Sequence, residues 1–125
     1  MHKKTDKIMG GMFGAIVGDA VGVPYEFHKP ENIPPYDQID MVPPSGFDRT
    51  WSQVPIGTYS DDGAQLLCVA DNLTKGLYSA EAMHHTLRRW ARAGYLSVDN
   101  DTFDIGMLTS AALSVDYHDV ARKFN

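Results

Sequence analysis

The residues best suited to chemistry lie in one short segment, 57–63, which reads GTYSDDG. It places the hydroxyl of Ser60 directly before the carboxylates of Asp61 and Asp62. Hydroxyl and carboxylate oxygens are hard ligands of the kind that Mg²⁺ and Mn²⁺ select. A helical pattern follows, and the unpaired N–H groups at a helix start favour negative charge. The segment therefore predicts a divalent cation site or, alternatively, an ordinary N-cap with an acidic first turn.

The composition is that of a soluble globular protein. With 125 residues, 43% of them hydrophobic and 22% charged, the chain fits one domain spanning 1–125. Its net charge of −5, without a dense Lys/Arg cluster, argues against nucleic acid as a partner. Cys68 is the only cysteine and lies among apolar residues, so we expect a buried, unreactive thiol and a reducing compartment.

The N-terminal apolar run does not have the pattern of a membrane segment. Glycines and Asp19 interrupt residues 8–23, and no small-residue cleavage site follows. A membrane span needs about 20 apolar residues without a charge. We therefore expect no membrane association and a cytoplasmic location.

Hydrophobic periodicity predicts four helical segments and no strand, hence an all-α fold. The helices are expected at about 5–21, 61–75 and 79–94 and from 104 onward, with a further amphipathic stretch at 120–124. The predicted buried stripe of the second helix consists of Leu66, Leu67, Val69, Ala70 and Leu73. Gly76 and Ser79 have the residue types of a helix end and of the next N-cap. The polar side of the third helix is interpreted as solvated surface; it carries His84, His85, Arg88, Arg89 and Arg92.

The first helix carries a glycine at every fourth position, namely Gly10, Gly14, Gly18 and Gly22. Each glycine costs a helix about 1 kcal/mol relative to alanine. A stripe of this kind favours close approach of a second helix, which would offset that cost.

All seven prolines fall in the segment 24–55, which excludes a continuous helix or a central strand there. Long loops in compact domains are commonly lids or binding segments. The alternative is a disordered linker, but linkers are poor in aromatic residues, and this segment contains Tyr25, Phe27, Tyr36, Phe47 and Trp51. We therefore expect a loop that packs and covers something.

Three motifs, in order along the chain, resemble those of the ADP-ribosylglycohydrolase family, which includes the dinitrogenase reductase-activating glycohydrolases and the J1 crystallins. They are GGMFGAIVGDAVGVPYE at 10–26, GTYSDD at 57–62 and FDIGMLTSAAL at 103–113. The resemblance implies an orthogonal multi-helix bundle around two Mg²⁺ or Mn²⁺ ions. It also implies hydrolysis of the bond that joins ADP-ribose to a protein side chain or another acceptor.

The same resemblance implies roles for individual residues. Ser60, Asp61 and Asp62 would be metal ligands, and Glu26 would be the catalytic acidic residue that reaches the ions or activates water. Asp19 would support the ligands from behind; its alternative role is capping or hydrogen bonding within a tight helix contact.

Several features depart from the family pattern. Family enzymes are considerably longer and carry a second ligand motif, Asp-x-Asp-(Ser/Thr), near the C-terminus. The similar segment 99–102 precedes the third motif and is not assigned that role. Ser60 replaces the commoner Thr, and Gly63 stands where many relatives have a hydroxyl residue.

We therefore expect the N-terminal part of such a domain, truncated and with an incomplete site. Its expected partners are an ADP-ribosylated protein or ADP-ribose conjugate, and a second copy or a complementing C-terminal segment. The alternatives are a non-catalytic ADP-ribose- or metal-binding module and a structural interaction protein.

Overall fold

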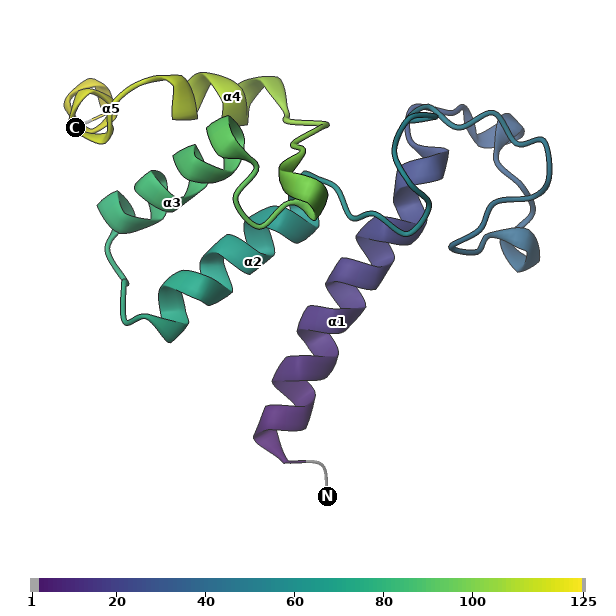
Figure 1. The fold of residues 1–125 in the computed structure, drawn as a ribbon, viewed down its shortest axis with the longest axis horizontal. Helices are drawn as coiled ribbons and strands as arrows, with labels where there is room; N and C mark the ends of the chain where they lie inside the picture. Colours follow the sequence, from purple (N-terminus) through teal and green to yellow (C-terminus); the bar gives the residue numbers. More distant parts are fainter. Residues whose placement is uncertain (1–2, 125) are drawn as a thin grey trace. The chain divides into compact units, whose positions relative to one another are not determined.

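The computed structural model describes residues 3–124, without the side chains at 120, 121, 123 and 124. All regular structure in that range is helical (Figure 1), which confirms the all-α prediction. The chain divides into two compact units that meet between Gly63 and Ala64. Residues 1, 2 and 125 of the predicted 1–125 domain lie outside the described range.

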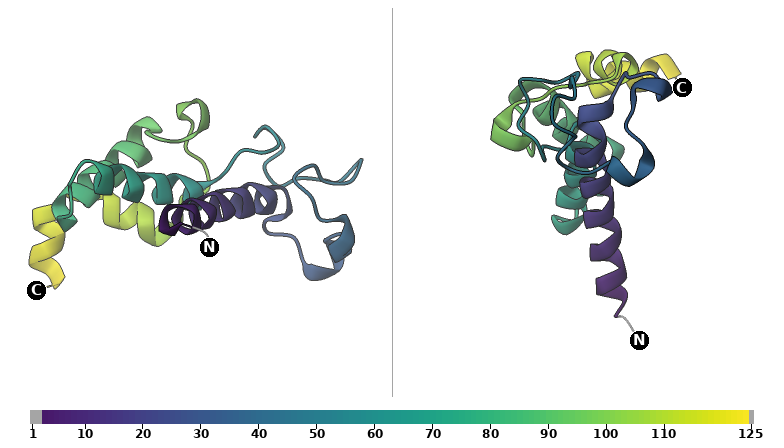
Figure 2. Two further views of the ribbon diagram at one scale, coloured as in Figure 1. Left: turned by 90° about the horizontal axis from the view of Figure 1, so that it is seen from below. Right: turned by 90° about the vertical axis from the view of Figure 1, so that its right-hand side faces the viewer.

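The first unit consists of a long helix and an irregular loop. Helix α1 (Lys4–Gly22) confirms the first predicted helix, and three 3₁₀ turns follow it: η1 (Val23–Tyr25), η2 (Pro30–Asn32) and η3 (Tyr36–Gln38). Figure 2 shows α1 as one uninterrupted helix, with the proline-rich loop at its C-terminal end. The proline-rich loop, residues 24–55, contains no α-helix, as its prolines predict.

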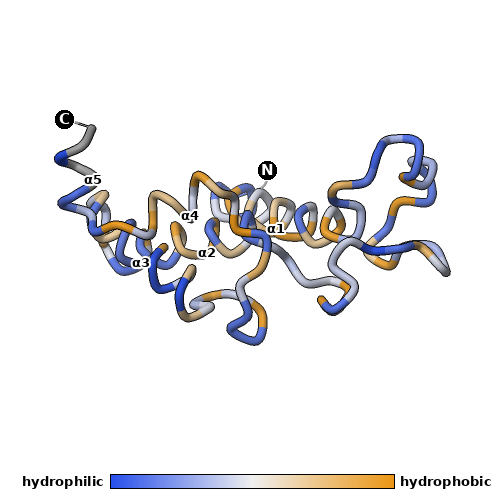
Figure 3. The backbone as a smooth tube through the Cα atoms, turned by 90° about the horizontal axis from the view of Figure 1, so that it is seen from above, coloured by the Kyte–Doolittle hydropathy of each residue, from blue (hydrophilic) through white to orange (hydrophobic). Residues whose placement is uncertain are grey.

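The prediction of a close helix contact along the glycine stripe is wrong for this structure. A Cβ atom placed on Gly10, Gly14, Gly18 or Gly22 would have no heavy-atom neighbour within 4 Å in the described chain. Much of α1 is apolar by hydropathy (Figure 3). Its apolar side chains are also exposed, with 60% of Phe13 and 54% of Ile8 accessible. The expected contact requires a second helix against this face, and the described part of the first unit supplies none.

The expectation that no segment is apolar enough for a membrane is also wrong. By length and composition alone, Lys4–Tyr25 passes that criterion. Glycines are close to neutral in hydropathy, and within residues 8–25 a single carboxylate, Asp19, does not outweigh the apolar residues around it. Core helices and signal sequences share this composition, so it does not assign the helix to a membrane.

The proline-rich loop is held by contacts among its own residues. The Tyr25 hydroxyl donates to the carbonyl of Asp40 at 3.0 Å. The Phe47 ring packs 5.1 Å from Tyr25 and 4.9 Å from His28 between centroids. The Arg49 guanidinium donates to the carbonyls of Ser52 and Val54 at 2.9 and 2.8 Å. Tyr25 and Phe47 therefore pack in the manner expected of an ordered loop, whereas Tyr36 is 92% and Phe27 78% exposed.

The second unit contains the remaining helices. Helix α2 (Asp61–Thr74) has its first turn in the first unit and continues here; α3 (Ala80–Ala93), η4 (Val98–Asn100), α4 (Met107–Ser114) and α5 (Tyr117–Phe124) follow. Ser79 caps α3, because its hydroxyl accepts the N–H of Ala82 at 3.1 Å. Gly76 ends α2 at φ 71°, and Leu77 N–H donates to the Asn72 carbonyl at 2.8 Å. The predicted helix ends are thus confirmed.

The buried face of α2 differs from the predicted stripe. Ala64, Cys68 and Asn72 form it, at helical spacing of four residues, whereas Val69 and Leu73 are exposed. Asn72 tolerates burial because the Thr86 hydroxyl of α3 donates to its Oδ1 at 2.7 Å. Hydropathy alone does not predict this face, because Asn72 is polar and its burial depends on the hydrogen bond from Thr86 of α3.

Cys68 is fully buried, which confirms that part of the expectation; its lack of reactivity stays a prediction. Burial raises its pKa to about 11, with a further increase from Asp71 and a partial offset from Arg89.

We predict no reaction of the Cys68 thiol of the folded protein with a thiol reagent at pH 8 and full reaction in guanidinium. Because unfolding lowers the thiol pKa, the free energy of unfolding should fall as pH rises from about 9 to 11; Cys68→Ser should lack this fall. Rapid labelling of the folded chain would contradict the assignment.

Gly94 and Gly76 provide a matched test of the turns that end α3 and α2. Both have positive φ, 63° and 71°, so alanine should strain each by about 1 kcal/mol. A Cβ at position 94 would also lie 1.9 Å from the carbonyl oxygen of Asn100, whereas one at position 76 meets nothing within 4 Å in the described chain. Denaturant unfolding should show Gly94→Ala at least about 2 kcal/mol more destabilising than Gly76→Ala. Equal losses would contradict the packing of the 94–100 turn.

Candidate functional site

The acidic segment 57–63 is anchored by the carboxylate of Asp19, which reaches it from α1. Asp19 Oδ2 accepts the backbone N–H groups of Ser60 and Gly63 at 2.9 and 2.7 Å. Its Oδ1 accepts the Ser60 hydroxyl at 2.7 Å. One carboxylate thus takes three hydrogen bonds from the start of α2, across more than forty residues of chain.

This arrangement is a helix cap supplied by another helix. Ser60 immediately precedes α2, and an N-cap hydroxyl would ordinarily accept the N–H of the third helical residue, Gly63. Here Asp19 accepts that N–H, and the Ser60 hydroxyl donates to Asp19 instead. The alternative expected for Asp19, a capping role, is therefore observed, and the same contacts also fix Ser60.

The acidic residues themselves differ in environment. Ser60 is buried, Asp61 is half-buried with its Oδ1 at 3.4 Å from the Ser60 hydroxyl oxygen, and Asp62 is exposed. The Ser60 and Asp61 oxygens are suited in type to a hard cation. Within residues 3–124, no three His, Cys, Asp or Glu side chains are grouped as a metal site. The donor chemistry fits Mg²⁺ or Mn²⁺, but the described groups alone do not complete a coordination shell, and the ligand assignment stays a prediction.

Glu26, the predicted catalytic residue, lies just after α1 at the start of the proline-rich loop. Its Oε2 accepts the indole N–H of Trp51 at 2.6 Å. Its backbone carbonyl accepts the Thr50 hydroxyl at 2.6 Å and lies 2.9 Å from Nδ1 of His28. The sequence did not predict Trp51 as the partner of Glu26. The one indication in the sequence is that Trp51 is an aromatic residue within an irregular, proline-rich segment.

Gly63 is a second residue whose role the sequence did not reveal. A Cβ atom there would lie 2.8 Å from the Cβ of Tyr59 and 2.9 Å from Oδ2 of Asp19. The absence of a side chain therefore permits the short contact between Asp19 and the start of α2. Gly63 departs from the family pattern, and it leaves the space that the carboxylate of Asp19 occupies.

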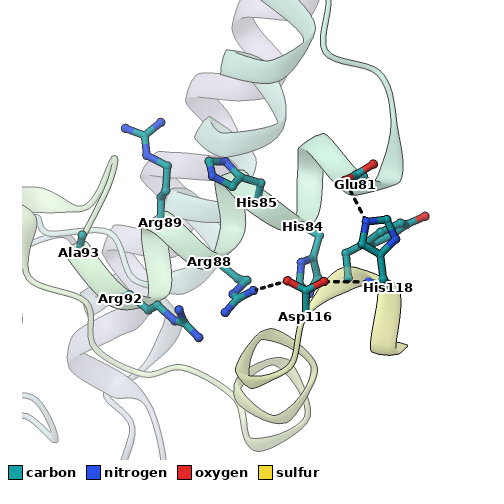
Figure 4. Close-up of a pocket in the computed structure, with 10 residues that line it drawn as sticks. Glu81, His84, His85, Arg88, Arg89, Arg92, Ala93, Asp116 and His118 are labelled. Carbon is teal, nitrogen blue, oxygen red and sulfur yellow. Dashed lines mark hydrogen bonds and ion pairs between the residues drawn. The ribbon is translucent and has the colours of Figure 1, made fainter. Parts of the chain in front are cut away.

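A separate pocket lies between α3 and α5 in the second unit (Figure 4). Arg88 pairs with Asp116 at 3.4 Å, and His118 pairs with Glu81 at 3.5 Å. His85, Arg89 and Arg92 also line it. His85, Arg88, Arg89 and Arg92 belong to the face interpreted as solvated surface, and the two contacts join α3 to the start of α5.

The helical fold and the three motifs agree with one family. The sequence matches the ADP-ribosylglycohydrolase family over residues 1–123. The chain belongs to the ADP-ribosylglycohydrolase family.

Two curated relatives share this part of the sequence. The chain is 31% identical over 113 residues to ADP-ribosylarginine hydrolase Tri1 of Pseudomonas putida (strain GB-1), and 29% identical over 112 residues to ADP-ribosylarginine hydrolase Tri1 of Serratia proteamaculans (strain 568). The matches cover 90% and 89% of the chain, but it spans only 28% of the length of each relative. No solved structure matches the chain.

Two glycine-to-alanine changes in the first unit should have opposite signs. Gly63→Ala should lower the free energy of unfolding by about 1–3 kcal/mol, because the added methyl overlaps Tyr59 and Asp19. Gly18→Ala, with no neighbour within 4 Å in the described chain, should raise it by about 0.5–1 kcal/mol through helix propensity. Denaturant titration measures both; a stable Gly63→Ala variant would rule out the short contact.

Proposed function

We propose that this chain contributes to metal-dependent hydrolysis of the bond between ADP-ribose and an arginine side chain of a modified protein. The observation that carries the proposal is the turn at 60–63, in which Asp19 fixes Ser60 beside Asp61 within a family of glycohydrolases. The arginine acceptor is proposed from the names of the two relatives.

Ser60, Asp61 and Asp62 are proposed to hold Mg²⁺ or Mn²⁺, with two ions in the complete site. The bond between Ser60 and Asp19 is consistent with this role: the hydroxyl donates its hydrogen bond to Asp19, so the lone pairs of Oγ point elsewhere. When bound, such ions would orient the ribose hydroxyls and lower the pKa of a bound water.

Glu26 is proposed to act as the general base. It would take a proton from water as the water oxygen bonds to the anomeric carbon of the ribose. The bond from that carbon to the guanidinium nitrogen breaks at the same centre, and the proton passes to the departing nitrogen. The products are ADP-ribose and unmodified arginine, with no oxidation or reduction.

A non-catalytic module is the second candidate function. It is favoured by the exposed apolar side chains of α1, which are typical of an interaction surface. The exposed apolar face of α1 suits a second copy or a complementing segment, either of which would supply further ligands. A cytoplasmic location is proposed with either function.

Metal binding is tested by Asp61→Ala combined with Asp62→Ala. Removing both carboxylates should abolish the heat of Mg²⁺ or Mn²⁺ binding in calorimetry, because the hydroxyl of Ser60 alone does not hold a divalent ion. Asp37→Ala combined with Asp48→Ala is the matched control. It removes the same charge from exposed positions of the same unit and should bind the metal as the original chain does.

Unchanged binding in the Asp61/Asp62 variant would remove the metal assignment. Release of ADP-ribose from an ADP-ribosylated arginine peptide, lost in the same variant, would support the enzyme. Metal binding without any release would support the non-catalytic module.

A further inference from the structure

We propose that Trp51 is a positioning residue for Glu26, so that the proline-rich loop serves to orient the catalytic carboxylate. This inference rests on the proposed function, in which Glu26 activates water. It assigns a role to the loop that the resemblance of motifs does not contain, since Trp51 lies outside all three motifs.

The contact between the two side chains is short and has one direction. The indole N–H donates to Glu26 Oε2 at 2.6 Å, a short distance for an N–H donor. Indole has a donor and no acceptor, so Trp51 favours the ionised carboxylate, which only accepts. A carboxylate has about four lone-pair sites, and one indole N–H occupies a single one of them. The contact therefore restricts the orientation of the carboxylate.

The Trp51 ring is itself placed by the residue next to Glu26. The ring of Phe27 meets it edge-on, with 6.3 Å between centroids. Phe27 adopts φ 60°, a left-handed conformation that is unfavourable for a bulky residue. Backbone strain of this kind persists only where surrounding contacts over-determine it. The strained residue, Phe27, lies between Glu26 and His28. Glu26 bonds to Trp51, His28 bonds to Thr50, and His28 also contacts the Glu26 carbonyl.

The backbone of Glu26 is held from the same part of the loop. The hydroxyl of Thr50 donates to the Glu26 carbonyl at 2.6 Å, and Nδ1 of His28 lies 2.9 Å from that oxygen. Thr50 and Trp51 thus bind the main chain and the side chain of one residue from 24 and 25 positions away. Two adjacent residues that hold both ends of an acidic residue restrict its rotation as well as its position.

The expected kinetic consequence follows from orientation. Loss of the indole donor should leave substrate binding intact but let the carboxylate rotate away from the attacking water. Such a defect lowers kcat and leaves KM nearly unchanged.

The test compares Trp51→Phe with Tyr25→Phe. Trp51→Phe removes the donor and retains an aromatic ring; Tyr25→Phe removes a donor of the same loop that bonds to Asp40 and not to the Glu26 carboxylate. With an ADP-ribosylated arginine peptide and Mg²⁺, Trp51→Phe should lower kcat about tenfold with KM within about twofold. Tyr25→Phe should leave both within about twofold.

A spectroscopic measurement checks the contact without turnover. The chain has two tryptophans, so its ¹H–¹⁵N spectrum should contain two indole signals. Trp51→Phe identifies the signal of Trp51, and Glu26→Gln should shift that signal. The Trp90 indole serves as an internal reference: its N–H is buried and has no hydrogen-bond partner in the described chain, so its signal should not move.

Each outcome decides the proposal. The role of Trp51 is overturned, and the proposed function is left standing, by either of two results. One is an indole signal of Trp51 that does not shift in Glu26→Gln; the other is turnover by Trp51→Phe equal to that of the original chain. Equal loss of kcat in Trp51→Phe and Tyr25→Phe would show general loop stabilisation and also overturns it. An original chain that releases no ADP-ribose overturns the proposed function and this role together, even if the indole signal responds.

Discussion

The carboxylate of Asp19 is the contact on which the candidate site depends. A helix start leaves N–H groups without partners, and Asp19 satisfies one of these, together with the N–H and hydroxyl of Ser60. This links the far end of α1 to the first turn of α2, across the whole proline-rich loop. Because one carboxylate accepts three short hydrogen bonds, the orientation of the acidic turn is set before any ligand arrives.

Local features of this fold were predictable from sequence, because neighbouring residues determine them. The start of α3 at Ser79 and the end of α2 at Gly76 follow from a hydroxyl and from backbone freedom at single positions. The acidic turn at 60–62 also appears at the predicted helix start. Fold class followed from the same periodicity, since no segment alternates like a strand.

Features that depend on distant partners were not predictable from sequence. The buried face of α2 was misplaced because Asn72 is buried only through Thr86 of the next helix. The contact between Trp51 and Glu26 joins positions 25 residues apart in a loop without periodicity. In the sequence, Gly63 is only a departure from a motif. The structure explains the glycine, because an Asp19 oxygen lies 2.9 Å from the place where a Cβ would be. The glycine stripe of α1 predicted a neighbour that the described chain does not contain.

The buried pair of Asn72 and Thr86 has a consequence for how α2 and α3 recognise each other. Two helices joined only by methyl and methylene groups can exchange neighbours by sliding one turn at little cost, because such contacts are not directional. The Asn72 amide oxygen, 2.7 Å from the Thr86 hydroxyl, opposes such an exchange. A shift of one helix along the other would leave both polar groups buried without a hydrogen-bond partner. The pair therefore selects one alignment of the hairpin from among several that hydrophobicity alone would tolerate.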